Sequence, residues 1–244
     1  MPKRKPEGKF EFVKTILIAG ALALGFRSLL FEPFNIPSGS MIPTLLVGDY
    51  LFVSKYSYGY SRYSFPFGVA PIDGRIFESQ PERGDVAVFR QPKNETVAFI
   101  KRIVGLPGDR IQVTDGVLRI NDVPVSRSKK GIATATDGYN VIKFVVYEET
   151  LPNGRSFVIQ ERSDNDMLDN TSVYEVPPGH YFMMGDNRDN SRDSRAASVG
   201  MVPAENLIGR AERLFFSHNG SASLWQIWKW PFAIRYGRLG DGIM

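Results

Sequence analysis

The sequence has no cysteine and only two histidines among its 244 residues. Without cysteine the chain can form no disulfide, no thiol nucleophile and no cysteine metal site. His180 and His218 both lie in turn-like segments, and the sequence has neither an HExxH pattern nor a histidine pair. These shortages argue against a Ser-His-Asp triad and against a zinc hydrolase, so we expect no metal and no cofactor. A hydrolase in this chain would then need a carboxylate or a lysine as its base.

The chain also carries little excess charge. The formal net charge is +4, and part of it comes from basic residues between positions 1 and 9. These residues do not indicate a nucleic-acid site, so we expect no nucleic-acid partner. Hydrophobic residues make up 43% of the chain, which is enough for a packed core. With 16 prolines, 23 glycines and many β-branched and aromatic residues, the composition predicts short strands joined by tight turns.

The longest apolar stretch lies near the N-terminus. We assign residues 1–12 to a basic cytoplasmic segment and residues 13–31 to a transmembrane anchor, whose uninterrupted apolar centre covers residues 15–26. A span of about 19 residues, at about 1.5 Å each, can just cross a hydrocarbon layer of about 30 Å. Because basic residues precede the span, we expect a single-pass membrane protein with a cytoplasmic N-terminus and an exported remainder.

Two other interpretations of this stretch remain open. A cleaved signal peptide has the same basic start and apolar run, and residues 21–23 supply an A-x-A pattern. Cleavage there would leave only a short apolar run before the cut, which disfavours this alternative. A buried core helix is the second alternative, because the uninterrupted apolar centre is shorter than a usual membrane span.

Downstream of the anchor, the residue pattern favours strands. We expect a mostly β protein: an N-terminal transmembrane helix, then an all-β catalytic domain (32–110 and 176–235) with a smaller β lobe (111–175) inserted in it. Within that lobe, the small and polar residues 126–137 predict an exposed loop. The expected strands are 49–54, 85–89, 97–104, 141–148 and 156–160, with a hairpin over 111–125.

Ser40 is the candidate nucleophile, in the segment Ile-Pro-Ser-Gly-Ser-Met-Ile-Pro-Thr at 36–44. Two prolines stiffen the chain around it, and Gly39 leaves room for a substrate backbone to approach. A serine on such a turn can present its hydroxyl outward while its own N–H faces a developing oxyanion, with Ser38 as a second donor. Taken alone, the segment is more typical of a linker between the anchor and the domain.

Lys101 is the candidate base, in the apolar run 97–104. Alternate residues of a strand share a face, so Lys101 would lie beside Val97, Phe99 and Ile103. Apolar surroundings disfavour the ammonium form and lower the pKa; a decrease from ~10.4 to ~7.5 takes about 4 kcal/mol, which burial can supply. The neutral amine can then accept a serine proton. Taken alone, the pattern is more typical of an edge-strand lysine that reaches water.

A third segment, at 185–195, reads Gly-Asp-Asn-Arg-Asp-Asn-Ser-Arg-Asp-Ser-Arg. Its alternating oxygen-bearing side chains suggest a calcium loop, but the glycine and the final glutamate that such a loop needs are absent. Interlocked Asp–Arg pairs that hold a hydroxyl in place are the better structural expectation.

Together these segments resemble the conserved boxes of the bacterial type I signal peptidases, or leader peptidases. The matching stretches are SGSMIPTL at 38–45, GDY at 48–50, KRIVGLPGD at 101–109, and GDNRDNS followed by DSR within 185–195. Four boxes in the right order and spacing are far more specific than any one alone. One departure is that this chain shows a single anchor, whereas some members of the family carry two.

The resemblance implies a serine protease with a Ser/Lys dyad, in which Ser40 is the nucleophile and Lys101 is the general base. It also implies that the Ser38 hydroxyl donates to the oxyanion and that the Ser191 hydroxyl orients the lysine. No cofactor is needed by such a dyad.

The resemblance further implies a structural ion pair between Asp193 and Arg195, close to the site. Substrate would run in an extended form beside the segments around Ser40 and Lys101. Shallow apolar pockets there would accept small side chains at the first and third positions before the cut. The candidate pocket residues are Ile36, Met41, Leu45, Phe99 and Ile100.

The implied function is that of a membrane-bound endopeptidase that cleaves signal peptides from exported preproteins after small residues, in the A-x-A pattern. Its partners would be preprotein signal peptides and the lipid bilayer. The resemblance places it in the inner (cytoplasmic) membrane, with the catalytic domain on the outer (periplasmic) face. The tryptophan-rich residues 223–232 and the aromatic residues 56–67 have compositions suited to the headgroup zone. The alternatives are a self-processing Ser/Lys protease and a membrane-tethered β domain that binds peptides without cutting them.

Overall fold

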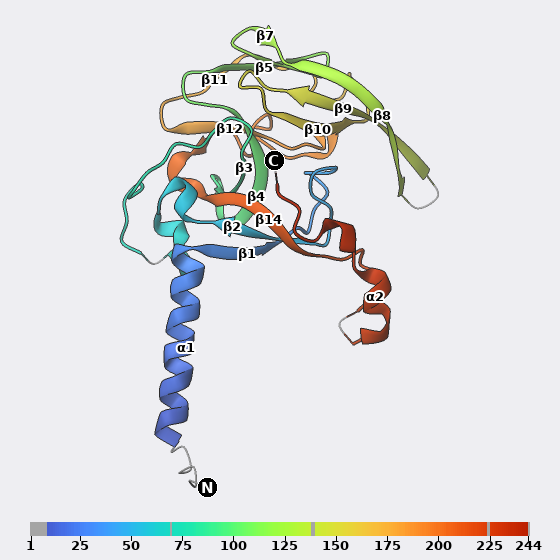
Figure 1. Cartoon of the computed structure of the whole chain (residues 1–244). Helices are drawn as coiled ribbons and strands as arrows, with labels where there is room; N and C mark the ends of the chain where they lie inside the picture. Colours follow the sequence, from blue (N-terminus) through green and yellow to red (C-terminus); the bar gives the residue numbers. More distant parts are fainter. Residues whose placement is uncertain (1–8, 69, 138–139, 224, 244) are drawn as a thin grey trace.

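The computed structural model describes residues 9–68, 70–137, 140–223 and 225–243. The described chain begins with helix α1 (Lys9–Leu29), which extends away from the rest of the molecule (Figure 1). Within it, Phe10–Leu29 is long and apolar enough to cross a membrane, and almost all of it is exposed. Exposure of this kind argues against a core helix. The basic residues expected at 1–8 lie outside the described residues.

Helix α1 ends where the apolar run meets Phe31-Glu32-Pro33. Proline disfavours a helical conformation in the residue before it, so the chain passes directly into strand β1 (Phe31–Asn35), and Phe31 lies in that strand rather than in the anchor. Glu32 pairs with Arg27 at 2.6 Å and with Lys55 at 2.5 Å. These ion pairs connect the end of the helix to the body of the protein.

The main body is a seven-stranded sheet with the order β1-β2-β14-β3-β4-β12-β13, and each neighbouring pair is antiparallel. Strands from both ends of the sequence therefore lie side by side in it (Figure 1). The expected mostly β architecture is confirmed. Besides β1, the strands are β2 (Asp49–Ser54), β3 (Val86–Gln91), β4 (Asn94–Gly105), β12 (His180–Met184), β13 (Val202–Pro203) and β14 (Leu207–Ser217).

Residues 110–175 form two further sheets, which lie together at the top of Figure 1. The orders are β11-β5-β6-β7 and β10-β9-β8. The strands of these two sheets begin and end close to the limits expected for the inserted lobe, 111–175, and those limits remain a prediction. The strands are β5 (Arg110–Thr114), β6 (Val117–Ile120), β7 (Val123–Pro124), β8 (Ser126–Asp137), β9 (Asn140–Thr150), β10 (Ser156–Glu161) and β11 (Tyr174–Glu175).

The prediction of a loop at 126–137 is wrong, because this segment is strand β8, paired with β9 along its whole length. Strand β9 is rich in valine, phenylalanine and tyrosine, which favour strands. Cross-strand pairing with such a neighbour stabilises the small and polar residues of β8 in an extended conformation. Composition alone could not show this, because the stabilising partner lies on another strand.

Strand β4 is the centre of the core. It contributes Ile100, Ile103 and Val104, each to a different one of three buried hydrophobic clusters. A strand held by packing on both faces is a rigid platform for a functional side chain.

The two aromatic segments suggested for the membrane surface differ in exposure. In residues 56–67, Tyr58 and Tyr63 are buried. Near the C-terminus, Trp225 and Phe232 are 84% and 85% exposed. The short helical turns are Tyr56–Tyr58, Arg62–Ser64, Pro66–Gly68, Arg188–Asn190 (η4), Ala204–Asn206, Ile227–Lys229 and Tyr236–Arg238, and α2 is Trp230–Ala233.

Candidate active site

The structure brings Ser40 and Lys101 into contact. Ser40 lies in the connection between β1 and β2, and Lys101 lies on β4. Lys101 Nζ is 2.5 Å from Ser40 Oγ, and it donates a second hydrogen bond to the carbonyl oxygen of Ile100 at 2.9 Å. Ser40 is 8% exposed and Lys101 is 4% exposed. The two candidate residues thus form a hydrogen-bonded pair that is largely shielded from water.

The turn that carries Ser40 is anchored by apolar side chains. Met41 and Leu45 are fully buried in the core cluster that also contains Ile36, and the Leu45 N–H donates to the Met41 carbonyl at 2.9 Å. The resemblance implied that both form substrate pockets. Neither lines the groove described below, although both share a cluster with Ile36 and Ile100, which do line it, and their pocket role remains a prediction.

Burial lowers the pKa of Lys101 to about 8, while the negative charges of Asp193 and Asp186 act in the opposite direction. An apolar environment disfavours the ammonium form, as the alternation of the strand predicts. A free lysine, with a pKa of about 10.4, is almost wholly charged near neutral pH. Lys101 therefore carries a much larger fraction of the neutral amine, which is the form that can accept a proton.

An apolar groove of about 360 Å³ opens beside this pair. Residues 34–38 form one part of its lining and residues 97–101 of β4 form another. Three of the expected pocket residues, Ile36, Phe99 and Ile100, are among the lining residues. Ser40 and Lys101 are themselves among the lining residues, so the groove opens directly onto the pair.

Ser38 lies in the same groove, next to the candidate nucleophile. Its Oγ is 3.5 Å from Ser40 Oγ. A hydroxyl at this position can turn toward the oxygen of a carbonyl under attack by Ser40, alongside the Ser40 backbone N–H. The geometry therefore suits an oxyanion donor.

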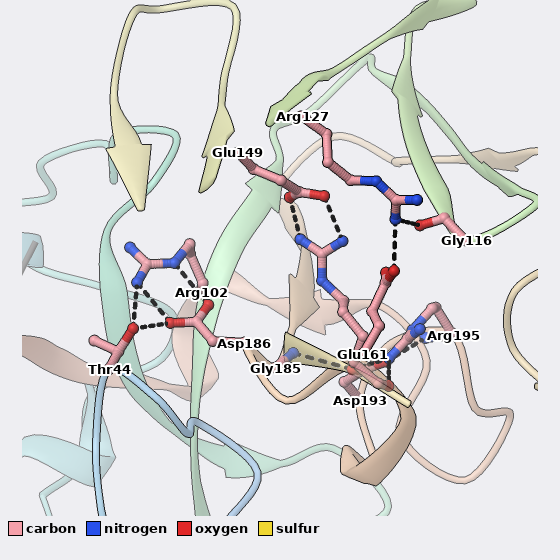
Figure 2. Close-up of polar contacts among 11 residues, drawn as sticks. Thr44, Arg102, Gly116, Arg127, Glu149, Glu161, Gly185, Asp186, Asp193 and Arg195 are labelled. Carbon is pink, nitrogen blue, oxygen red and sulfur yellow. Dashed lines mark hydrogen bonds and ion pairs between the residues drawn. The ribbon is translucent and has the colours of Figure 1, made fainter. Parts of the chain in front are cut away.

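Asp193 and Arg195 form a buried pair through two hydrogen bonds, Nε to Oδ1 at 3.0 Å and Nη2 to Oδ2 at 2.9 Å (Figure 2). Asp193 also accepts from the Gly185 N–H at 3.0 Å. Burial acts to raise the pKa of Asp193, but the charge of Arg195 and these hydrogen bonds hold it below its ordinary value. Asp193 is therefore ionised, and its charge reaches Lys101.

Ser191 packs against the glycine that begins this loop. A Cβ atom added at Gly185 would lie 2.2 Å from Ser191 Oγ, so only glycine fits there. Among the residues that the structure describes, Ser191 Oγ is buried and makes no hydrogen bond to Lys101, and its hydroxyl helps to lower the pKa of Asp193. Its expected bond to Lys101 is thus not formed in this structure, and its orienting role remains a prediction.

Asp186 connects the two segments that carry the candidate dyad. Its carboxylate accepts from Arg102 Nε at 2.9 Å and Nη2 at 2.7 Å, and from Thr44 Oγ1 at 2.5 Å (Figure 2). Arg102 follows Lys101 in β4, and Thr44 belongs to the turn of Ser40. Since Arg102 and Asp186 are both almost fully buried, this charge-assisted contact fixes the turn against the strand.

Asn187 adds two further bonds to the same turn. Its N–H donates to the Ser40 carbonyl at 3.1 Å, and its Nδ2 donates to the Gly39 carbonyl at 2.8 Å. Asp186, Asn187 and Arg102 all lie within the matching boxes, but the resemblance implied no role for them. Arg102 lies on the strand face opposite to Lys101, and a buried arginine there indicates an acidic partner. The sequence cannot identify that partner, because Asp186 is distant in the chain and meets Arg102 only in the fold.

Comparison with known proteins bears directly on this site. A family model described as "Signal peptidase, peptidase S26" matches residues 9–216. The chain belongs to this family. It is 47% identical to Signal peptidase I of Rickettsia typhi over 204 residues, which cover 80% of this chain and 76% of that protein. It is 46% identical to Signal peptidase I of Rickettsia conorii over 218 residues, which cover 86% of this chain and 78% of that protein.

A solved structure of a signal peptidase I from Enterococcus faecalis is 26% identical to this chain, with a TM-score of 0.32. The match covers 54% of this chain and 97% of the solved chain. The signal peptidase family expected from the four boxes is confirmed, and the chain is a serine endopeptidase of that family. Within the described ranges, no group of three or more histidine, aspartate or glutamate side chains is arranged to hold a metal ion.

Proposed function

We propose that this signal peptidase cleaves signal peptides from exported preproteins, with Ser40 as the nucleophile and Lys101 as the general base. One observation carries the residue assignment: Lys101 Nζ lies 2.5 Å from Ser40 Oγ, in a site where the amine has a pKa of about 8. A general base must first be within hydrogen-bond reach of its proton and then have a pKa near the working pH. Lys101 meets both requirements.

In the acylation step, the neutral Lys101 amine accepts the Ser40 proton as Oγ attacks the scissile carbonyl carbon. The carbonyl oxygen becomes an oxyanion, to which the Ser40 N–H and the Ser38 hydroxyl donate. Loss of one such donor lowers the rate roughly 100- to 1,000-fold in serine proteases. The Lys101 ammonium then gives its proton to the departing amine, which becomes the N-terminus of the mature protein.

In the deacylation step, the neutral Lys101 amine removes a proton from a water molecule that attacks the acyl ester. The proton returns to Ser40 Oγ as the signal peptide leaves with a free carboxylate. Burial favours the neutral amine, and the charges of Asp193 and Asp186 favour the ammonium. This balance allows one amine to accept and release a proton near neutral pH.

The apolar groove supports a preference for small residues before the cut. A substrate that adds as an extended strand between residues 34–38 and 97–101 would make main-chain bonds on both sides. Alternate side chains of a strand face the same way, so the first and third residues before the cut would both face the wall that contains Ile36 and Ile100, which belong to one buried cluster. Bulky side chains of this wall leave room for alanine-sized groups, as the A-x-A pattern requires.

We further propose that α1 crosses the inner membrane once, with the N-terminus in the cytoplasm and the catalytic domain on the periplasmic face. The exposure of Phe10–Leu29 supports a lipid-facing helix. Ser40 follows soon after the end of α1, so the dyad would lie near the outer bilayer surface. The exposed side chains of Trp225, Trp228 and Phe232 would contact the headgroup region there.

The test is cleavage of a preprotein by the full-length protein in detergent. We expect one cut after the second alanine of Ala-x-Ala, identified by N-terminal sequencing of the product. Ser40→Ala and Lys101→Met should abolish it, whereas the exposed-site controls Ser221→Ala and Lys129→Met should cut at the wild-type rate. Full activity of either dyad variant would show that the assignment is wrong, and an inactive wild type would refute the proposed function.

A further inference from the structure

A buried ion pair joins the inserted sheets to the loop that contacts the dyad. Arg188, in η4, donates through Nη1 to Glu149 Oε1 at 2.7 Å and through Nη2 to Glu149 Oε2. Glu149 lies near the end of β9 and is 0% exposed, and Arg188 is 2% exposed. A two-bond contact between a planar guanidinium and a carboxylate fixes direction as well as distance.

A second pair lies beside the first one. Arg127 of β8 donates to Glu161 Oε2 of β10 at 2.5 Å and to the Gly116 carbonyl at 3.2 Å (Figure 2). Glu161 Oε1 and Arg188 Nε are buried and have no hydrogen-bond partner among the described residues. Each of the three strands of the β10-β9-β8 sheet thus contributes one ionisable side chain to this cluster. Its fourth residue, Arg188, comes from the active-site loop.

Arg188 acts on the dyad through its neighbours in the chain. Asn187, the preceding residue, holds the carbonyls of Ser40 and Gly39 at 3.1 Å and 2.8 Å. The Arg188 carbonyl itself accepts from Arg195 Nη2 at 2.6 Å. A movement of Arg188 would therefore move the Ser40 turn on one side and the partner of Asp193 on the other.

Other contacts also join this loop to the inserted region. The Gln160 N–H of β10 donates to the Asp186 carbonyl at 2.9 Å, next to a parallel bridge between Gln160 and Asn187. The Asp189 carboxylate accepts from the N–H groups that follow β10, those of Arg162 at 2.6 Å and Ser163 at 3.1 Å. The loop itself contains no regular element other than η4. The Glu149–Arg188 pair differs from these contacts because it is buried, is made by two side-chain bonds and holds the residue that directly follows Asn187.

We propose that Glu149 is a positioning residue for the proposed cleavage reaction. Through Arg188 it fixes residues 186–188, and through Asn187 it fixes the Ser40 turn against Lys101. The three-stranded sheet is then a support of the active site rather than an accessory to it. This inference rests on the proposed function, because its consequence is a change in the rate of that reaction.

The test separates a positioning role from a structural one by using three variants. Glu149→Gln removes the carboxylate that accepts both guanidinium bonds of the buried Arg188. The double variant Glu149→Leu with Arg188→Met replaces the pair by apolar groups of similar size. Asp122→Asn is the matched control, since it removes the same kind of charge from the exposed Arg110–Asp122 pair in the inserted region. Cleavage rates are expressed per folded molecule, with Tm and the folded fraction measured by circular dichroism.

We expect Glu149→Gln to lower both Tm and kcat. The apolar double variant should recover the Tm of the wild type, because well-packed hydrophobic residues often replace a buried ion pair without loss of stability. Its kcat should nevertheless stay at least about tenfold below the wild-type value, since small errors in the position of catalytic groups cost this much or more. KM should change less than about twofold, and Asp122→Asn should match the wild type.

A stably folded apolar variant with the wild-type kcat would overturn the proposal. If that variant does not fold, Glu149→Asp decides: it keeps the charge but shortens the side chain, and a wild-type kcat would again contradict the positioning role. A wild type that cuts while every variant cuts equally fast refutes only this inference. A wild type that does not cut refutes the proposed function as well.

Discussion

At the scale of single residues, Lys101 shows what strand alternation can and cannot predict. The pattern at 97–104 placed the lysine on an apolar face and predicted a lowered pKa, and the structure has both. Alternation does not apply to Met41 and Leu45, because they lie in a turn whose side-chain directions depend on the core beneath it. It also could not find Asp186 as the partner of Arg102, because that contact joins residues far apart in the sequence.

The lowered pKa of Lys101 predicts a stability effect with a definite sign. The folded-state pKa is about 8, whereas the unfolded value is about 10.4, so the unfolded chain holds the proton more tightly. Burial of Lys101 therefore lowers the free energy of unfolding by about 3 kcal/mol. This loss is complete below pH 8 and disappears as the pH rises toward 10.4. We expect the Tm of Lys101→Met minus that of the wild type to be largest at pH 7 and to decrease by pH 10, as measured by thermal unfolding in detergent.

The matched control for this experiment is the exposed Lys129. Its replacement by methionine should give a Tm difference from the wild type that does not change with pH over the same range. A difference for Lys101→Met that grows with rising pH would mean that Lys101 is stabilised in its charged form, contrary to the pKa argument.

At the scale of elements, the strands with strong β-forming residues were predictable. The segments 49–54 and 156–160 lie within β2 and β10 as expected. Residues 126–137 were wrongly predicted as a loop, because their extended conformation depends on pairing with β9. Helix α1 was expected from its apolar length, although its end is set by the sharp change to β1 rather than by hydrophobicity.

The C-terminal segment allows a direct optical test of membrane contact. The sequence has three tryptophans, and all of them, Trp225, Trp228 and Trp230, lie within this segment. In proteoliposomes we expect their fluorescence to be quenched by lipids brominated near the headgroup more strongly than by lipids brominated near the chain end, because tryptophan prefers the interface. Free access of aqueous iodide to all three, with no quenching by either lipid, would contradict this contact.

At the scale of the whole molecule, the seven-stranded sheet carries the dyad and the inserted sheets support it from behind. The four sequence boxes lie in three distant parts of the chain, and the fold brings Ser40, Lys101 and the loop 185–195 together. The family and its class of chemistry could be predicted because those boxes are specific. The role of the inserted sheets could not be predicted, because the Glu149–Arg188 pair joins one box to strand β9, which lies outside all four boxes.

The central claim is that the neutral amine of Lys101 is the base, and the dependence of kcat/KM on pH tests it most directly. The rate of cleavage should rise with pH and level off above a midpoint near 8, the pKa of the buried amine. Replacing both histidines, His180→Gln and His218→Gln, should leave this midpoint unchanged, and Lys101→Arg should be inactive at every pH because arginine stays protonated. A midpoint near 6.5 that disappears with the histidines, or an active Lys101→Arg variant, would contradict the account.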